Sequence, residues 1–421
     1  MIRHFTVGFS RILVGTLFIF SGLIKANDPL GFSYKLEEYW VEFGMNWEWL
    51  ISLGVPLAVF LCVLEIVLGV ATLVGYKMKI VSRLLLLLMA FFTVLTFASA
   101  VFGLVKSCGC FGDAIPLTPW QSFIKDVILI ILVVVLFGDG EKIKPYANRY
   151  WETAFVVFPT VLMAYAAYLV DWQFPLYYTL AILGFGFITY LANLRFGPLW
   201  TVIISLISAL WFSIHVIDHL PMRDFRPYAV GKNIPDQMQL PEGAKPDIYR
   251  NTFLYKNLTT GKVEEFDDSN YPWDDENYEF VDRETVLIEK GDEAKITDLS
   301  IMDVDGYNLT EDILNDPDPV LLVISYNVLK AGSRNIKDLS KLVKQCNAKG
   351  FSAVGLSASD PTMVDEFKSA NDLEIPFYAT DEITLKTIVR SNPGLVLLEG
   401  GTVKAKWHVN DVPTFEELTG N

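Results

Sequence analysis

The sequence predicts an α-helical membrane domain of about seven spans followed by a soluble α/β region. Seven long apolar runs fill the first 219 of the 421 residues, and no such run follows them. Residues 1–219 contain 13 Lys/Arg and 13 Asp/Glu, whereas the remainder contains 21 and 36 and carries the whole net charge of −15. An acidic soluble region argues against nucleic acid, and against an anionic lipid surface, as its partner.

Each apolar run is long enough for a membrane span, which needs about 20 mostly apolar residues. The first run lacks a small-x-small cleavage pattern, so we expect it to remain as a membrane helix. The segment 26–50, rich in Trp and Tyr, predicts a short helix along the membrane surface. The pair at 151–193 is joined by a very short turn and could instead be re-entrant. The expected spans are 7–25, 51–75, 82–104, 119–137, 151–170, 175–193 and 197–219.

The Lys and Arg residues of the connections predict the orientation of the chain. One set of alternate connections, which begins with Arg3, carries eight of them, and the other set carries only Lys25, Lys35 and Lys106. The richer set is expected to face the cytoplasm together with the N-terminus. With seven spans, the soluble region then lies on the outer side of the membrane.

Ionisable residues within the expected spans form a candidate polar site, because a charge at membrane depth is costly and often functional. Glu65 lies near the middle of the second span, and it could instead form a structural ion pair with Arg11 or Lys25. Lys125 and Asp126 lie about one turn into the fourth span. We expect these two to pair with each other or to snorkel towards the interface.

His215 and His219 share one face at the end of the last span, a spacing that can hold a metal ion. An interfacial position without metal is the commoner arrangement for such a pair. The sequence contains no Ser/His/Asp set, phosphate-binding loop or firm metal motif. A hydrolase or a kinase is therefore not expected.

Cys108 and Cys110 are the candidate catalytic residues, in a connection expected on the outer side of the membrane. Cysteines two positions apart can form a small strained disulfide, and strain makes such a bond exchange-competent. Gly109 gives the backbone freedom that so small a ring needs, and Lys106 would favour a thiolate. The alternative is two reduced cysteines in a glycine-rich turn. Cys62, about 16 Å deep in the second span, is expected in the core.

Short motifs in the first part resemble the DoxX family of bacterial membrane proteins. They are RILVG at 11–15, FIFSGLIK at 18–25, DPLGF at 28–32 and LEIVLG at 64–69. CGCFGD at 108–113 resembles the MauE branch, which is linked to methylamine utilisation and to maturation of disulfide-rich partners. The resemblance implies a four-helix unit within 1–137, with 138–219 adding three helices. It also implies a bacterial inner membrane and a periplasmic soluble region.

The soluble region divides into two expected parts. Residues 220–295 predict a β-rich subdomain, with a hairpin turn at 259–262 between alternating stretches. Residues 296–421 predict a hairpin at 298–309 and then an alternation of strands and helices. The expected strands are 320–326, 351–356, 377–378, 395–398 and 403–407, and the expected helices are 333–349, 362–370 and 382–390.

This alternation resembles a thioredoxin-like domain of the TlpA and peroxiredoxin type. The family places a reactive C-x-x-C directly after the strand at 320–326, but residues 327–330 contain no cysteine. Pro393 matches the family's cis-proline, and Cys346 falls in a helix where no redox partner is expected. The resemblance therefore implies a domain that binds a protein and does not reduce it, although a fold alone assigns no role.

Three functions remain open. The first is redox-linked maturation of an envelope protein through Cys108 and Cys110, which would make the chain a thiol-disulfide oxidoreductase. The second is a non-enzymatic scaffold whose thioredoxin-like domain, which lacks the C-x-x-C, binds an envelope protein. The third is a quinone- or lipid-binding protein, or a small transporter, organised around Glu65, although the internal repeat of many transporters is missing. The lipid bilayer and an envelope protein are the expected partners, and a quinone is the cofactor considered.

Overall fold

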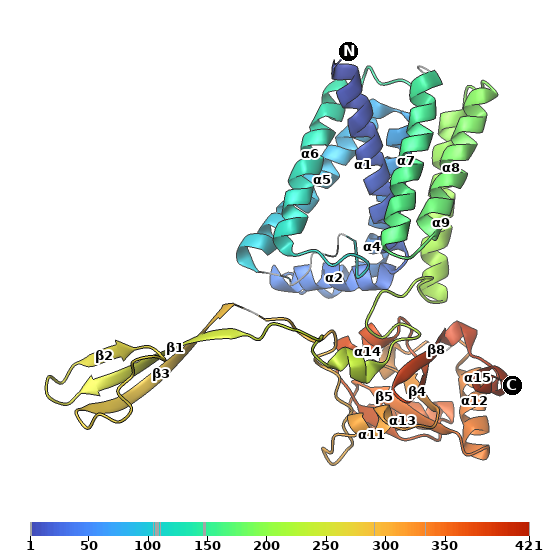
Figure 1. Ribbon diagram of the computed structural model, residues 1–421. Helices are drawn as coiled ribbons and strands as arrows, with labels where there is room; N and C mark the ends of the chain where they lie inside the picture. The colour runs from blue at the N-terminus through green and yellow to red at the C-terminus, as the bar shows by residue number, and fades with distance from the viewer. Residues whose placement is uncertain are drawn as a thin grey trace.

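A computed structural model describes residues 2–103, 105, 109, 111–145, 149–289, 291–332 and 334–420. Cys108, Cys110 and Lys106 lie outside the described residues. A helical bundle forms the first part, and an α/β domain lies against one end of it (Figure 1). The N-terminus lies at the opposite end of the bundle.

The seven predicted spans are confirmed as helices. Within the described residues, seven helices are long and apolar enough to cross a membrane. The predicted pair at 151–193 forms two helices of 21 and 18 residues. The seven are α1 (Ile2–Ala26), α4 (Gly54–Val74), α5 (Met78–Phe102), α6 (Pro119–Asp139), α7 (Arg149–Leu169), α8 (Phe174–Leu191) and α9 (Gly197–Asp218).

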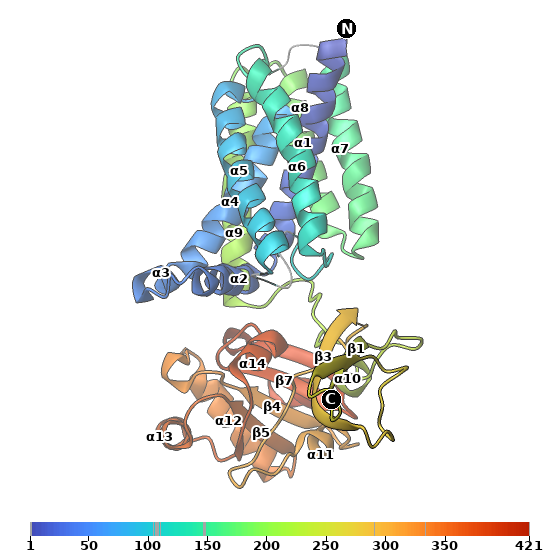
Figure 2. The same ribbon diagram turned by 90° about the vertical axis from the view of Figure 1, so that its left-hand side faces the viewer.

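The segment expected at the membrane surface forms helix α2 (Pro29–Glu42), which lies across the end of the bundle (Figures 1 and 2). Its start follows from the sequence, because Asp28 accepts a hydrogen bond from the Gly31 N–H and Pro29 occupies the first turn. Leu36 and Trp40 are buried in the hydrophobic core of the bundle. The short helix α3 (Glu48–Ser52) follows it.

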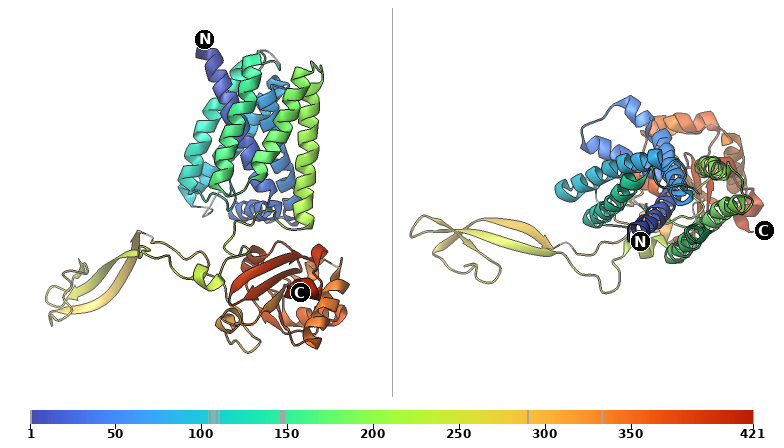
Figure 3. Two further views of the ribbon diagram at one scale, coloured as in Figure 1. Left: turned by 45° about the vertical axis from the view of Figure 1, so that its right-hand side comes forward. Right: turned by 90° about the horizontal axis from the view of Figure 1, so that it is seen from above.

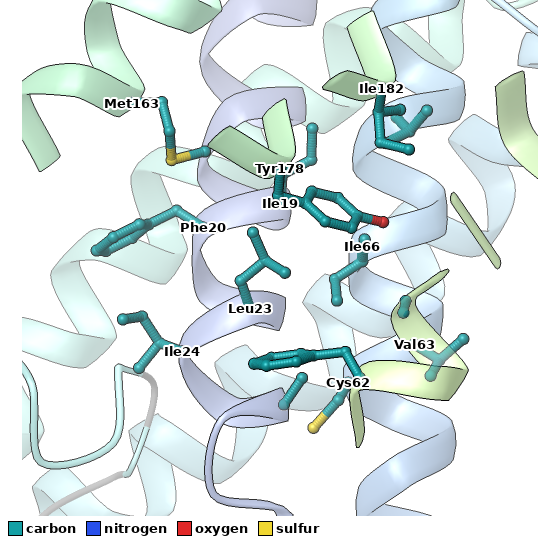
Figure 4. Packing of buried hydrophobic residues seen from close by; sticks show 14 of the residues in the cluster. Ile19, Phe20, Leu23, Ile24, Cys62, Val63, Ile66, Met163, Tyr178 and Ile182 are labelled. Carbon is teal, nitrogen blue, oxygen red and sulfur yellow. The ribbon is translucent and has the colours of Figure 1, made fainter. Parts of the chain in front are cut away.

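Glycines let α1 and α4 approach closely. A Cβ atom on Gly69 would lie 2.7 Å from the Gly15 carbonyl oxygen, and one on Gly22 would lie 3.0 Å from the Cys62 carbonyl oxygen. Small residues at such crossings allow backbones to pack in membrane bundles. Figure 4 shows the resulting core, in which Ile19 and Leu23 of α1 lie beside Ile66 of α4.

The α/β domain contains a five-stranded sheet in the order β6-β5-β4-β7-β8. The pairs β4–β5 and β5–β6 are parallel, whereas β7 runs antiparallel to both β4 and β8. This order and these directions agree with the resemblance to thioredoxin-like domains. The strands are β4 (Val320–Ile324), β5 (Ser352–Ser357), β6 (Phe377–Ala379), β7 (Gly394–Glu399) and β8 (Thr402–His408).

The three helices predicted in this domain, at 333–349, 362–370 and 382–390, are confirmed close to their expected positions, and three further short α-helices were not predicted. The hairpin predicted at 298–309 is wrong as a pair of strands, because only an isolated bridge joins Met302 to Asn308. The Asp303 carboxylate accepts hydrogen bonds from the N–H groups of Asp305 and Tyr307 and forms a tight turn instead. The helices are α10 (Ile234–Met238), α11 (Thr310–Leu314), α12 (Ile336–Ala348), α13 (Pro361–Asn371), α14 (Glu382–Ile388) and α15 (Phe415–Thr419).

A separate antiparallel sheet, which we call the arm, consists of β1 (Ile248–Asn257), β2 (Val263–Phe266) and β3 (Tyr278–Glu289). The predicted hairpin turn lies between β1 and β2. The β-rich part is smaller than the predicted 220–295, because Tyr228 and Ile234 are buried in the core of the α/β domain. The segment before the arm therefore belongs to the α/β domain.

Candidate functional site

A cavity of about 500 Å³ lies between the membrane bundle and the α/β domain. Its wall includes residues from the end of α1, from α2, from the loop between α5 and α6, and from α14. The segment that links α9 to the α/β domain closes another side through Arg223 and Phe225. The position at the end of the bundle makes this cavity the main candidate site.

Gly109, the residue between the two candidate cysteines, lines this cavity. Its φ of 64° lies in the left-handed region, which a glycine adopts without steric cost. A Cβ atom on Gly109 would lie 3.5 Å from Lys35 Cγ, so this residue packs against α2. Cys108 and Cys110 themselves lie outside the described residues.

An ion pair joins the two parts of the protein at the cavity wall. Arg390 Nε donates to both carboxylate oxygens of Asp28, at 3.0 and 2.9 Å. The ring of Tyr34 lies beside this pair, with Lys386 Nζ 4.8 Å and Arg390 Cζ 5.3 Å from its centroid. Burial, reinforced by the neighbouring Tyr326, raises the pKa of Tyr34, so its hydroxyl stays protonated.

Two cations share one largely buried carboxylate in the cavity wall. Arg226 Nε donates to Asp224 Oδ1 at 2.7 Å, and Lys406 Nζ donates to Asp224 Oδ2 at 2.9 Å. Burial alone would raise the pKa of Asp224, but the two cations hold it well below its usual range. Burial and the adjacent Arg226 lower the pKa of Lys406 to about 7.

The linker after α9 is tied to both parts. Asn27 Nδ2 donates to the Arg223 carbonyl at 2.7 Å, and Arg223 Nη2 donates to Asp171 at 2.6 Å. His219 Nδ1 lies 2.8 Å from both carboxylate oxygens of Asp411. Within the described residues, neither His215 nor His219 belongs to a group of three possible metal ligands. His219 instead contributes to the contact between α9 and the α/β domain.

The loop where the resemblance expects a C-x-x-C also faces the bundle. Its first residue, Asn327, accepts hydrogen bonds from the N–H groups of Leu329 and Lys330 and so begins a short 3₁₀ turn. The Asn392 amide donates to the Asn327 carbonyl at 2.8 Å, and the Asn392–Pro393 peptide bond is cis. Lys386 lies over Tyr326 at the start of this loop as well as over Tyr34 of α2.

The predicted polar site lies in the bundle, close to the cavity. Lys25 Nζ contacts Glu65 Oε1 at 2.5 Å, and Ser21 Oγ donates to Glu65 Oε2 at 2.9 Å. Both charged side chains are buried. Arg11 is not the partner of Glu65. It donates instead to the carbonyl oxygens of Thr72 and Leu73.

A second ion pair, with a buried carboxylate and a half-buried lysine, lies near the first. Lys125 contacts Asp126 at 2.5 Å, and Thr96 Oγ1 donates to the same carboxylate at 3.0 Å. Both pairs line a cavity of about 30 Å³, which has room for about one or two water molecules. Lys25 lines this small cavity and the large one, so the polar site reaches the candidate site.

Comparison with known families identifies the first part of the chain. Residues 3–138 match the family described as methylamine utilisation protein MauE. The N-terminal part is a MauE-family domain. It holds α1 to α6 and, with them, Glu65, Lys25, Gly109 and both candidate cysteines.

Two further comparisons cover other parts of the chain. Residues 249–290, which contain most of the arm, match a domain of unknown function, DUF8463. Protein TlpB of Flavobacterium psychrophilum is 32% identical over an alignment of 159 residues, which covers 33% of this chain and 38% of that protein. The chain therefore spans well under half of that relative's length. No solved structure matches the chain.

The remaining cysteines are buried and reduced. Cys62 lies in the core between α1 and α4 of the MauE-family domain (Figure 4), and Cys346 lies in α12. Burial raises the pKa of Cys346 to about 11, which keeps its thiol protonated and unreactive.

Sequence reasoning found the polar site of the MauE-family domain and missed the contacts that fix the α/β domain upon it. Asp28, Arg390, Asp224 and Lys406 were not predicted as site residues. The sequence does indicate one role of Asp28, because an Asp directly before a Pro marks the start of a helix. The others are isolated charges in strands or turns, and nothing in their spacing shows that they are buried.

Proposed function

We propose that this protein supports disulfide-linked maturation of an envelope protein, through Cys108 and Cys110 of its MauE-family domain. The observation that carries the proposal is the position of Gly109 in the wall of the cavity under the α/β domain. Both cysteines are bonded directly to this residue in the chain. In this proposal, a partner's thiols enter the cavity to reach the two cysteines.

The thiol–disulfide exchange itself needs no reactant besides the two thiols of the partner. A thiolate of the partner attacks a Cys108–Cys110 disulfide and releases one of the two cysteines as a thiolate. The partner's second thiolate then attacks the mixed disulfide and releases the other cysteine. The partner gains a disulfide, and Cys108 and Cys110 become thiols that hold the two electrons. Reoxidation releases two electrons and two protons, for which we propose a quinone of the bilayer as acceptor. The charge of Lys106, two residues before Cys108, would favour a thiolate.

We further propose that the membrane is the bacterial inner membrane and that the α/β domain lies in the periplasm. The excess of Lys and Arg in the connections on the side of the N-terminus supports this orientation. The periplasm is a compartment where disulfides persist. In this arrangement the α/β domain, which lacks the C-x-x-C, covers the cavity and leaves the chemistry to the MauE-family domain.

The test is the redox state of the two cysteines in the full-length protein. The protein would be acid-quenched, alkylated and examined by mass spectrometry after equilibration with glutathione buffers. We expect a reversible Cys108–Cys110 disulfide with a reduction potential above roughly −300 mV, whereas structural disulfides lie below that value. A control with Cys62→Ser and Cys346→Ser should titrate identically. Thiols that stay reduced in every buffer would overturn the proposal.

The α/β domain supports a second candidate, a scaffold without redox chemistry. Its loop at 327–330 contains no cysteine, and its contacts with α2 hold it at the bundle. In cells, the Cys108→Ser and Cys110→Ser variants separate the two functions. A scaffold keeps the partner mature in both variants, whereas a thiol exchanger loses that maturation.

A further inference from the structure

The arm projects away from both the bundle and the α/β domain (Figures 1 and 3). Its strand order is β2-β1-β3, so β3 lies at an edge of the sheet. Within the described residues, β3 pairs with β1 alone, and its other edge meets no strand over its 12 residues. The edge of β3 therefore presents a long row of backbone N–H and C=O groups that pair with no strand among the described residues.

Several side chains along β3 are both apolar and exposed, although β3 forms an unpaired edge of the sheet. Val286, Leu287 and Ile288 are 54%, 44% and 49% exposed, and Phe280 and Val281 are 56% and 49% exposed. Neighbouring residues of a strand point to opposite faces, so apolar surface is open on both sides of the sheet. Proteins normally cover or shorten an edge of this kind, because it pairs readily with another chain.

The charge of the arm indicates what kind of molecule can bind along the edge of β3. Residues 248–289 contain eleven Asp/Glu and four Lys/Arg, a net charge of −7. Two copies of β3 would place like charges opposite each other, which destabilises strand pairing. An anionic lipid surface would repel the arm for the same reason. A basic, extended segment is complementary to it.

The face of the α/β domain that bears the loop at 327–330 is not free for this role. Arg390 and Lys386, on the same face, contact Asp28 and Tyr34 of the membrane domain. The arm, in contrast, projects away from both the bundle and the α/β domain (Figure 3).

We propose that the arm captures a protein partner by adding one of its basic, extended segments as a fourth strand beside β3. Backbone hydrogen bonds along the edge supply affinity in this mode of recognition, and alternate side chains supply specificity. Basic side chains of the segment lie against Glu284 and Glu289, which share one face of the sheet, and its apolar side chains lie on the opposite face, which carries Leu287. This inference concerns binding alone and does not rest on the proposed redox chemistry.

The experiment measures binding of labelled peptides to the full-length protein in detergent by fluorescence anisotropy. The probe is KVKVTVKVK, and its two controls are EVEVTVEVE, with the opposite charge, and KVKPTPKVK, which keeps the charge but cannot complete a strand. We expect KVKVTVKVK to bind, and both controls to bind at least about tenfold more weakly.

Two variants locate the binding site. E284K/E289K reverses two charges on the β3 edge, and D274K/E276K reverses two exposed charges in the loop before β3. The edge variant should weaken binding at least about tenfold and the loop variant less than about threefold. Hydrogen exchange of β1 and β2 amides checks that the arm of each variant is folded. Failure of KVKVTVKVK to bind, equal binding of the proline peptide, or equal losses in both variants would each overturn the proposal.

Discussion

Arg390 of the α/β domain donates to the Asp28 carboxylate, which is also the N-cap of the membrane-surface helix α2. The two residues are 362 positions apart in the chain. Arg390 is 7% exposed and Asp28 is 21% exposed, so water screens the pair only in part. One carboxylate therefore starts a helix of the membrane domain and holds the soluble domain above the cavity.

We predict that Arg390→Gln and Asp28→Asn each loosen the α/β domain from α2. Asn is as good an N-cap as Asp, so Asp28→Asn removes the charge and keeps the helix start. The two changes should couple by about 1–3 kcal/mol, as expected for a charge-assisted hydrogen bond. Hydrogen exchange in α2 and α14 measures the loosening, and the double variant should be little worse than either single one.

The control for this prediction is Lys404→Gln, which breaks an exposed ion pair with Glu399 in the same domain. It should leave the exchange of α2 unchanged. If the two single changes add fully in the double variant, the pair does not hold the domains together.

Lys406 should make the stability of the α/β domain depend on pH. Its pKa is lowered from 10.5 to about 7 in the folded protein, mainly by burial. Below about pH 7 both states are protonated, and the cost of burying the charge is fully present. Between about pH 7 and pH 10.5 the unfolded chain binds more protons, so stability rises with pH.

The measurement is urea unfolding of the full chain at about pH 6 and about pH 9, followed by circular dichroism of the α/β domain. Lys406→Met should remove the rise between the two values, whereas Lys404→Met, on the same strand and exposed, should keep it. A rise that is unchanged in Lys406→Met would assign the pH dependence to another group.

Glu65→Gln should strongly destabilise the bundle. It leaves the Lys25 ammonium buried without a counter-charge, which costs about 3–5 kcal/mol in buried pairs. The double variant Lys25→Met/Glu65→Gln should recover most of this loss. Thermal unfolding in detergent measures both, and Lys79→Gln, in an exposed pair with Glu141, should melt like the parent protein. Equal melting of Glu65→Gln and Lys79→Gln would contradict a structural role for the pair.

Hydrophobic pattern predicted the fold because burial depends on local periodicity. The spans follow from which residues lie at membrane depth, and the alternation of strands and helices follows from the periodicity of apolar residues in the soluble region. The sequence left Arg11 and Lys25 as possible partners of Glu65, and the structure pairs Glu65 with Lys25. The contact of Asp28 with Arg390 depends on how two domains dock, which no local pattern encodes. Lys406 occupies an alternating strand where a lysine normally reaches solvent, so its burial beside Asp224 could not be seen from the sequence.

The crossing of α1 and α4 gives the last prediction, which concerns Gly69. A Cβ atom there would lie 2.7 Å from the Gly15 carbonyl oxygen and 2.9 Å from the Ile19 nitrogen, both backbone atoms that cannot rotate away. Gly69→Ala must therefore push the two helices apart, with a cost of about 1–3 kcal/mol, typical of overpacking. Gly138→Ala in α6 is the matched control, because its Cβ meets no atom within 4 Å. In thermal unfolding, Gly69→Ala should melt lower than the parent and Gly138→Ala should not. Lys25 and Glu65 belong to these same two helices. A melting curve for Gly69→Ala that matches the parent protein would therefore contradict the close crossing of α1 and α4 that brings this ion pair together.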